Sequence, residues 1–340
     1  MKQVKIIVAL MAGLFSFASV NAGEMTVTGT MQVTYQSEPD SQTGNPLGIE
    51  NDLKWSASTE LDNGTAVDFY IATDGTTLTF DDTRIDYTTP FGKIGVGNNG
   101  DPADAKDDVT PSAFEEANGA GAGTFGADIG SNGSMGVFLS NGDILGTGIS
   151  VAYAHYPKLD ATTGGPKAAT GDANANVGSG ESINIVTSLA NLPGIGSTPL
   201  GGLTLTLAAE DKESTLTADM QKKEAATVAL TYAQGPVKIG YQRKGVADTT
   251  TTLAAKTFYK DEIIGIAFAV NDALSISWNK YSSDRHSNAS TNVEQEATAY
   301  NLSYTMGGLT LGLQSAKVDN AGFAVGTEDE TRTISLVTAF

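Results

Sequence analysis

The sequence contains no cysteine and only two histidines among its 340 residues. Without thiols the chain can form neither a disulfide nor a zinc–thiolate site, and it has no cysteine nucleophile. The two histidines, His155 and His286, stand in no recognisable Ser/His/Asp frame, which argues against a hydrolase that uses a histidine base. We therefore predict that the protein is not an enzyme, and we expect no catalytic residue, metal site or cofactor.

Positive charge and long apolar runs are also scarce. The chain carries 20 Lys and Arg against 39 Asp and Glu, a formal net charge of −19. Such an acidic chain disfavours nucleic acid and anionic lipid headgroups as partners. Beyond residue 22, the longest largely apolar run is IIGIAFAV at 263–270, far short of the roughly 20 residues of a spanning helix. Such a chain can span a membrane only as a closed β-sheet.

The first 22 residues have the pattern of a secretory signal peptide. Two lysines precede a largely apolar stretch, which ends in the small-residue cleavage pattern Val20-Asn21-Ala22. We expect residues 1–22 to be removed and residues 23–340 to form a single domain. A retained amphipathic helix is the alternative interpretation.

Apolar and polar residues alternate along most of the remaining chain. Examples are LTLTLA at 203–208, LSISW at 274–278 and GLTLGL at 308–313, which follow the two-residue period of a strand. The opposite face carries Thr, Ser, Gly, Asn and Gln with few charges, unlike the charged exterior of a soluble sandwich. Segments of about ten alternating residues, separated by turns, are typical of a transmembrane barrel.

The alternation predicts an all-β fold, a transmembrane antiparallel up-and-down barrel whose last strand pairs with its first. Sixteen strands are expected, at 25–36, 50–61, 65–74, 81–89, 93–98, 133–141, 147–156, 181–191, 202–210, 224–234, 237–245, 260–270, 273–283, 294–305, 308–318 and 328–340. Tight turns are expected at 62–64, 90–92, 235–236, 271–272 and 307–308. Longer polar loops alternate with these turns, so the tight turns should lie together at one end.

Aromatic residues recur at one position relative to the tight turns. The alternation of side chains along each strand places all of these aromatics on the apolar face. They are Tyr87, Tyr232, Phe268, Tyr304 and Phe340. A ring of aromatics at one level of an apolar band is typical of the interfacial girdle of a membrane barrel. Ordinary core aromatics of a soluble sandwich are the alternative.

Two stretches resemble the Gram-negative general porins. TRIDYTTPFGKIGVGNNG (83–100) is similar to that family's fourth strand, tight turn, fifth strand and entry into the third loop, and ELDNGTAVDFYI (60–71) to its second-to-third hairpin. The resemblance in architecture covers the chain after residue 22. It implies a homotrimer of sixteen-stranded barrels in the outer membrane, in contact with its lipid. It also implies that the barrel-assembly machinery reads the terminal Phe340.

The loop at 98–123 is the candidate constriction of the pore. The preceding strand is so short that the chain should leave the wall near mid-height, and the inward-facing Gly95 and Gly97 should leave space for the loop. Six carboxylates are expected to line the pore: Asp101, Asp104, Asp107, Asp108, Glu115 and Glu116. The alternative is a solvated surface loop.

Bases are expected on the wall that faces these carboxylates. Parity turns Lys54 and Arg84 inward, and Arg84 matches the family's basic position on its fourth strand. The chain is therefore predicted to be a water-filled outer-membrane channel for passive diffusion of small hydrophilic solutes and ions, with a preference for cations. A solute-selective porin, an outer-membrane barrel hydrolase and a secreted β-rich adhesin are the alternatives.

Overall fold

The computed structural model of the chain describes residues 25–38, 44–73, 80–117, 126, 129, 135–157, 159, 177–192, 194–214, 221–248, 257–287 and 292–340. The expected signal peptide at 1–22 lies outside the described residues. So does the end of the candidate constriction loop, residues 118–123. Within the described ranges, no helix is long and apolar enough to cross a membrane.

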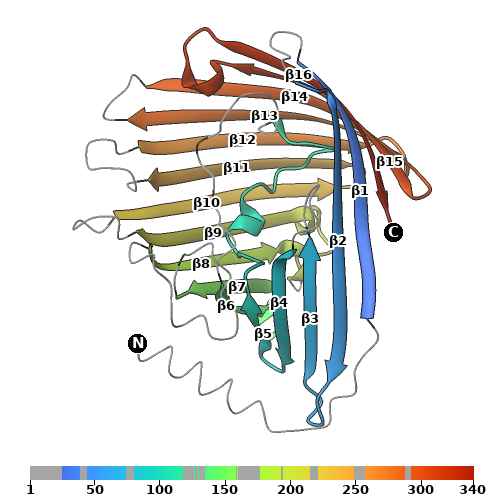
Figure 1. Cartoon of the computed structure of the whole chain (residues 1–340), viewed down its shortest axis with the longest axis vertical. Coiled ribbons are helices and arrows are strands. Elements are labelled where there is room, and N and C mark those ends of the chain that lie inside the picture. The colour runs from blue at the N-terminus through green and yellow to red at the C-terminus, as the bar shows by residue number, and fades with distance from the viewer. Residues whose placement is uncertain are drawn as a thin grey trace.

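Sixteen antiparallel strands form one closed barrel, in which each strand pairs with its neighbours in chain order (Figure 1). The first eight are β1 (Met25–Ser37), β2 (Leu47–Glu60), β3 (Ala66–Thr73), β4 (Phe80–Thr89), β5 (Gly92–Gly97), β6 (Gly136–Asn141), β7 (Ile149–Tyr156) and β8 (Val177–Ser188). The others are β9 (Leu203–Ser214), β10 (Gln221–Gln234), β11 (Val237–Asp248), β12 (Thr257–Ala269), β13 (Leu274–Ser287), β14 (Val293–Met306), β15 (Leu309–Asp319) and β16 (Glu328–Ala339). The predicted fold class is confirmed.

The first and last strands close the barrel. Thr30 of β1 lies opposite Ala339 of β16. The Gly29 N–H donates to the Phe340 carbonyl and the Phe340 N–H donates to the Gly29 carbonyl, both at 3.0 Å. A Cβ on Gly29 would come within 2.8 Å of the Phe340 ring, so glycine allows the terminal ring to lie across β1. The pairing removes the last open edge of the sheet.

The alternating sequence places apolar side chains outside the barrel and polar side chains inside it. On β9, Leu205 and Leu207 are each 40% exposed, whereas Thr206 between them is 5% exposed. The same alternation holds across β10 to β16, where the outward residues include Leu230, Ile266 and Leu336. An apolar outer surface of this extent is the lipid-facing band of a membrane barrel.

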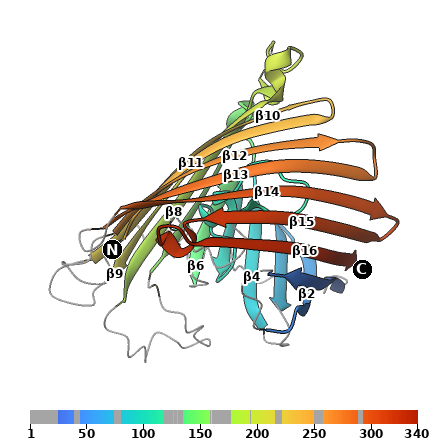
Figure 2. The ribbon, with the colours of Figure 1, turned by 90° about the horizontal axis from the view of Figure 1, so that it is seen from above.

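The connections at the two ends of the barrel differ in length, as predicted from the turn residues. The tight turns lie together, and the one at Gly235 and Pro236 joins β10 directly to β11. Two connections at this end are longer. The one between β6 and β7 contains a short 3₁₀ helix, η3 (Ile144–Gly146). Between β8 and β9 the chain forms two short 3₁₀ helices, η5 (Leu189–Asn191) and η6 (Pro199–Gly202). They project from the ends of these two strands (Figure 2), and neither helix was expected from the sequence.

All five predicted girdle aromatics fall on the outward face by strand register. Phe268, Tyr304 and Phe340 are exposed there, and Tyr232 is half-buried. Tyr87, paired with Val67 across β3 and β4, is only 7% exposed. Three of the five aromatics are therefore openly exposed in the single chain, and their role as an interfacial girdle remains a prediction.

Candidate functional site

The chain leaves the barrel wall at the end of the short strand β5. Arg84 of β4 holds this point, because its Nη1 donates to the Asn99 carbonyl at 3.0 Å. Its Nε is 2.7 Å from Asp86 Oδ1, and its guanidinium lies over the Phe138 ring at 4.3 Å. Gly100 has a φ of +99° and would place a Cβ 2.1 Å from Arg84 Nη1. A glycine is thus required where the chain turns inward.

The expectation that Gly95 and Gly97 make space for the loop is wrong. A Cβ on Gly95 would come within 2.1 Å of Asp86 Oδ1 and 3.0 Å of Arg84 Nε, and one on Gly97 would lie 2.3 Å from the neighbouring strand's backbone. These glycines make space for the Arg84–Asp86 pair and for the close approach of β4. Arg84 is largely buried and anchors the loop entry, so it is not a free base facing the carboxylates.

The loop first meets the opposite wall at β8. The Ala103 N–H donates to Ser182 Oγ at 2.8 Å, and Asn184 Nδ2 donates to the Pro102 carbonyl at 2.6 Å. The Ser182 hydroxyl also donates to Asp101. Both wall side chains are buried members of the inward face, so this part of the loop lies inside the barrel. Asp101 is itself buried and serves as an attachment to the wall.

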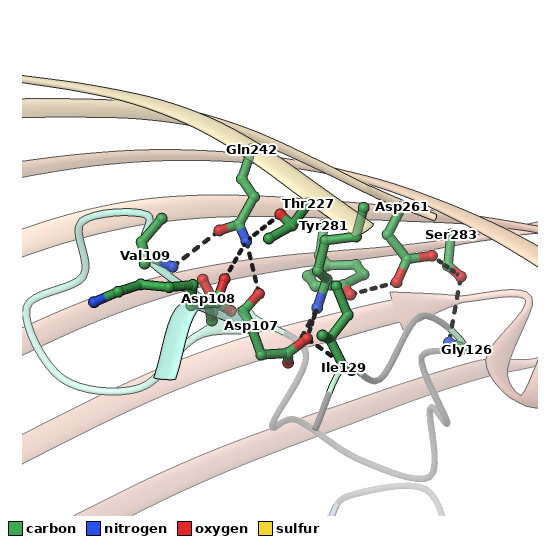
Figure 3. A network of polar contacts seen from close by, with 12 residues as sticks. Asp107, Asp108, Val109, Gly126, Ile129, Thr227, Gln242, Asp261, Tyr281 and Ser283 are labelled. Carbon is green, nitrogen blue, oxygen red and sulfur yellow. Dashed lines mark hydrogen bonds and ion pairs between the residues drawn. The ribbon is translucent and has the colours of Figure 1, made fainter. Parts of the chain in front are cut away.

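A second attachment lies on β11, where one glutamine binds three backbone groups of the loop (Figure 3). Gln242 Nε2 donates to the carbonyls of Lys106 at 3.0 Å and Asp107 at 2.7 Å, and its Oε1 accepts from the Val109 N–H at 2.9 Å. Two residues along, the buried Lys244 Nζ lies 3.1 Å from Asp107 Oδ1. Asp107 is therefore paired with a wall base that the sequence analysis had not singled out.

The loop continues across β13 and β15. The Ala113 N–H donates to Ser277 Oγ at 2.9 Å, and Gln314 Nε2 donates to the Glu116 carbonyl at 3.1 Å. Glycines on the wall make room for it, since a Cβ on Gly312 would lie 2.5 Å from the Phe114 ring. From Asp101 to Glu116 the loop thus follows the inner surface of β8 to β15. Of its six carboxylates, Asp104 is exposed, and Glu115 and Glu116 are half-buried.

The wall on the other side of the barrel is left open by the loop. On β2, the inward-facing Glu50, Lys54 and Ser58 are exposed, whereas the inward face under the loop is buried. Lys54 lies over the Tyr70 ring, with Nζ 4.1 Å from the centroid. Lys54 was expected from the sequence and Glu50 was not, although both lie on the inward-facing side of the same strand. The exposed face of β2 and the loop therefore bound a solvent-accessible space.

Burial and neighbouring charge raise the pKa values of three loop carboxyls. Burial, followed by the charge of Glu116, raises the pKa of Asp108 to about 6, although Lys244 acts in the opposite direction. Burial and then the charge of Glu50 raise the pKa of Glu115, so Glu115 feels the charge of a residue on the open wall. Burial also raises the pKa of Glu116. These groups change charge at a milder acidity than free carboxylates.

Neither histidine takes part in the site. By register, His155 and His286 fall on the outward face of β7 and β13. His155 Nδ1 is 3.6 Å from Glu181 Oε1, and the His286 ring packs against Phe258. Among the described residues no group of three or more His, Asp and Glu side chains could hold a metal ion. The closed barrel with its apolar exterior also does not fit a soluble β-rich adhesin.

No known protein family and no curated protein matches the sequence. Solved structures do match. OmpT of Vibrio cholerae covers 95% of this chain and is itself covered completely, at 10% identity and a TM-score of 0.70. The anion-selective porin of Comamonas acidovorans has 14% identity, coverage of 94% and 100%, and a TM-score of 0.67. OmpF of Salmonella typhi has 12% identity, coverage of 94% and 98%, and a TM-score of 0.67.

Identities this low show a shared fold and no more. The chain has the sixteen-stranded barrel of the porins. Its apolar exterior and closed hydrogen-bonded wall are those of a protein embedded in the outer membrane of a Gram-negative cell.

The Lys244–Asp107 pair should hold the loop in place. Replacing Lys244 with Met leaves Asp107 without its wall base, and breaking a buried pair in this way costs about 3 to 5 kcal/mol. Since each 1.4 kcal/mol is a factor of ten, amide hydrogen exchange across 103–110 should accelerate by about one hundredfold to a few thousandfold. Lys212→Met is the matched control, because Lys212 pairs with Glu210 on β9. Unchanged exchange in Lys244→Met would contradict the assignment.

Charge selectivity should depend on pH. With the pKa of Asp108 at about 6, lowering the pH neutralises loop carboxyls earlier than the ordinary value of about 4 would allow. We expect any cation preference to weaken as the pH falls from about 7 to about 5, measured as the reversal potential in a salt gradient. Asp108→Asn combined with Glu115→Gln should flatten this profile. Replacing both histidines with Gln should leave it unchanged, and the opposite pattern would refute the explanation.

Proposed function

We propose that this protein is a porin, a water-filled outer-membrane channel through which small hydrophilic solutes and ions diffuse passively. One observation carries the proposal. The loop covers the inner wall of β8 to β15 but leaves polar and charged side chains of β2 exposed inside the barrel. Exposed Glu50 and Lys54 need water around them, so this side of the lumen is the proposed solute path. No catalytic step is part of the proposal.

The proposed channel prefers cations. Glu50, Asp104 and Glu115 border the open space, with Lys54 as the exposed base on β2. Carboxylates around a narrow passage favour cations, and low-dielectric walls concentrate their field. A neighbour of the same fold is named an anion-selective porin, so the barrel does not decide the sign. The side chains at the constriction do. A solute-selective porin remains the alternative within this proposal, because few lumen residues set selectivity.

The proposed functional unit is a homotrimer. The outward face of β1 and β2 carries exposed Met25, Met31, Leu47 and Ile49, a surface of small to medium apolar side chains with few aromatics. Such a surface suits contact with another barrel as well as contact with lipid. One structural neighbour, OmpT of Vibrio cholerae, is described in a trimer form. We further propose that the barrel-assembly machinery recognises the terminal Phe340, whose ring is exposed beside Gly29.

Planar-bilayer recording tests the proposal. Purified protein should give stepwise conductance with a cation-signed reversal potential in a KCl gradient. A unit charge about 4 Å from the ion path contributes about 1 kcal/mol in water, about a fivefold effect. Glu50→Gln with Glu115→Gln should therefore lower the cation-to-anion permeability ratio by about fivefold to twentyfold. Lys54→Ala should raise it.

Glu262→Gln is the control, because Glu262 lies on the outward face of β12 and pairs with Lys260 there. The effects should shrink as salt rises and the Debye length falls from about 10 Å at 0.1 M to about 3 Å at 1 M. Absence of stepwise conductance would end the channel proposal. An anion-signed potential in the unmodified protein would leave the channel but reject the cation preference.

A further inference from the structure

The connection between β8 and β9 differs in composition from the rest of this acidic chain. We call its described residues, 189–192 and 194–202, the foot. No Asp, Glu, Lys or Arg occurs anywhere from Ile183 to Ala209, although such residues make up 17% of the sequence. The other connections at this end are shorter, and several carry a charge, such as Asp272 between β12 and β13. Among the described connections at the end with the tight turns, the foot is therefore the longest, and it carries no charged residue.

The foot is held in a defined conformation by its own backbone hydrogen bonds. The N–H groups of Ile195 and Gly196 donate to the Leu192 carbonyl at 3.1 and 3.0 Å, and the Thr198 N–H donates to the Ile195 carbonyl at 2.8 Å. Its two halves pack closely, since a Cβ on Gly201 would lie 2.3 Å from the Gly196 carbonyl oxygen. The satisfied backbone groups lower the cost of placing this segment in a poorly hydrated environment.

The base of the foot is held by the barrel wall. A Cβ on Gly202 would come within 2.2 Å of the Ala233 carbonyl oxygen on β10, and a Cβ on Gly148, after β6, would lie 2.6 Å from Asn191 Cβ. The foot is thus fixed between neighbouring hairpins, and it projects beyond the wall from the ends of β8 and β9 (Figure 2).

The exposed Leu200 of the foot continues the lipid-facing surface of the two flanking strands, while Asn191, Ser197 and Thr198 are the exposed polar residues of the foot. Ile185 on β8 and Leu205 on β9 face outward and are exposed. At the end of these strands Leu200 of the foot is 55% exposed. The neighbouring hairpin ends present apolar side chains at the same end of the barrel, with Phe91 88% exposed and Leu145 95% exposed. A groove of about 1090 Å³, lined by residues that include Phe91, Ile144 and Tyr153, lies on this side.

Outer-membrane barrels have their short turns on the periplasmic side. We propose that the foot, which lies at this end, inserts into the periplasmic leaflet of the outer membrane and anchors this side of the barrel in its phospholipid. Two observations favour lipid as the partner of the foot. The foot continues the outward-facing apolar side chains of β8 and β9, and it carries no charge that would oppose insertion. The proposal concerns placement in the membrane and does not depend on conduction through the lumen.

Tryptophan fluorescence in vesicles tests the proposal. The chain has two tryptophans, and replacing Trp55 and Trp278 with Phe gives a silent background. Leu200→Trp is then compared in full-length protein inserted into phosphatidylethanolamine–phosphatidylglycerol vesicles whose acyl chains are brominated near the headgroup or near the chain end. We expect quenching of Leu200→Trp that approaches that of Leu205→Trp on the lipid-facing wall, and that is stronger with bromine near the headgroup. Thr198→Trp, a second exposed position in the foot, provides an independent reading.

The control at the same end of the barrel is Asp272→Trp, which should be quenched weakly because its turn is polar and exposed. Foot variants that behave like Asp272→Trp, with red-shifted emission and little quenching, would place the foot in water and overturn the proposal. Blue-shifted emission without quenching would indicate a protein partner or a second copy of the chain, and would overturn it equally. Strong quenching of Leu205→Trp in the same vesicles separates these outcomes from a failure of the barrel to insert.

Discussion

A strand in hydrocarbon has no water to bind its backbone, so every N–H and C=O in the wall needs a partner strand. The rest of this structure depends on that constraint. It requires the barrel to close, and Gly29 and Phe340 make the last two backbone bonds of the seam. It also requires alternation in the sequence, because each strand separates lipid from the polar interior. The absence of cysteine and the small number of prolines are compatible with a wall stabilised by its hydrogen-bond ladders.

The same constraint acts on the loop inside the barrel. Its backbone groups, brought against a wall, need partners as well, and the wall supplies them through polar side chains. Gln242 alone satisfies three loop backbone groups, while Ser182, Asn184 and Asn279 satisfy others. Because these partners lie on one side of the barrel, the loop is held to that side. The space that remains lies along β2, and the charges that face it come from both the loop and the wall.

The sequence predicted the fold well because the strands obey a local rule. Alternation with period two and the positions of Gly, Asn and Pro locate all sixteen strands to within four residues. The predicted strands left 192–201 as a connection between β8 and β9, but no local pattern there predicted the two 3₁₀ helices of the foot. Residues that act across the barrel were also harder to find. Lys244 and Gln242 contact a loop more than 100 residues away, and no local pattern in the sequence predicts that register.

The contacts of several charged residues also could not be predicted from the sequence, because their partners lie on other strands or on the loop. Parity correctly placed Arg84 on the inner wall, but only the structure shows it bound to Asp86 and Asn99. Asp101 and Asp107 were expected to line the pore, but they attach the loop to the wall through Ser182 and Lys244. Glu50 lies on the exposed inward face of β2. Composition identifies a charged constriction, but three-dimensional contacts decide which charges remain available to a passing ion.

The position of the loop inside the barrel is the central claim, and a disulfide tests it most directly. The chain has no cysteine to interfere, and Ser112 Oγ lies 3.4 Å from Ser277 Oγ on β13, so the two side chains that would carry the sulfur atoms are in contact. Oxidised Ser112→Cys, Ser277→Cys protein should contain this disulfide by mass spectrometry. Ser112→Cys with Ser315→Cys, on the outward face of β15, should not form one. A reduced 112–277 pair in folded protein would place the loop outside the lumen and contradict the account.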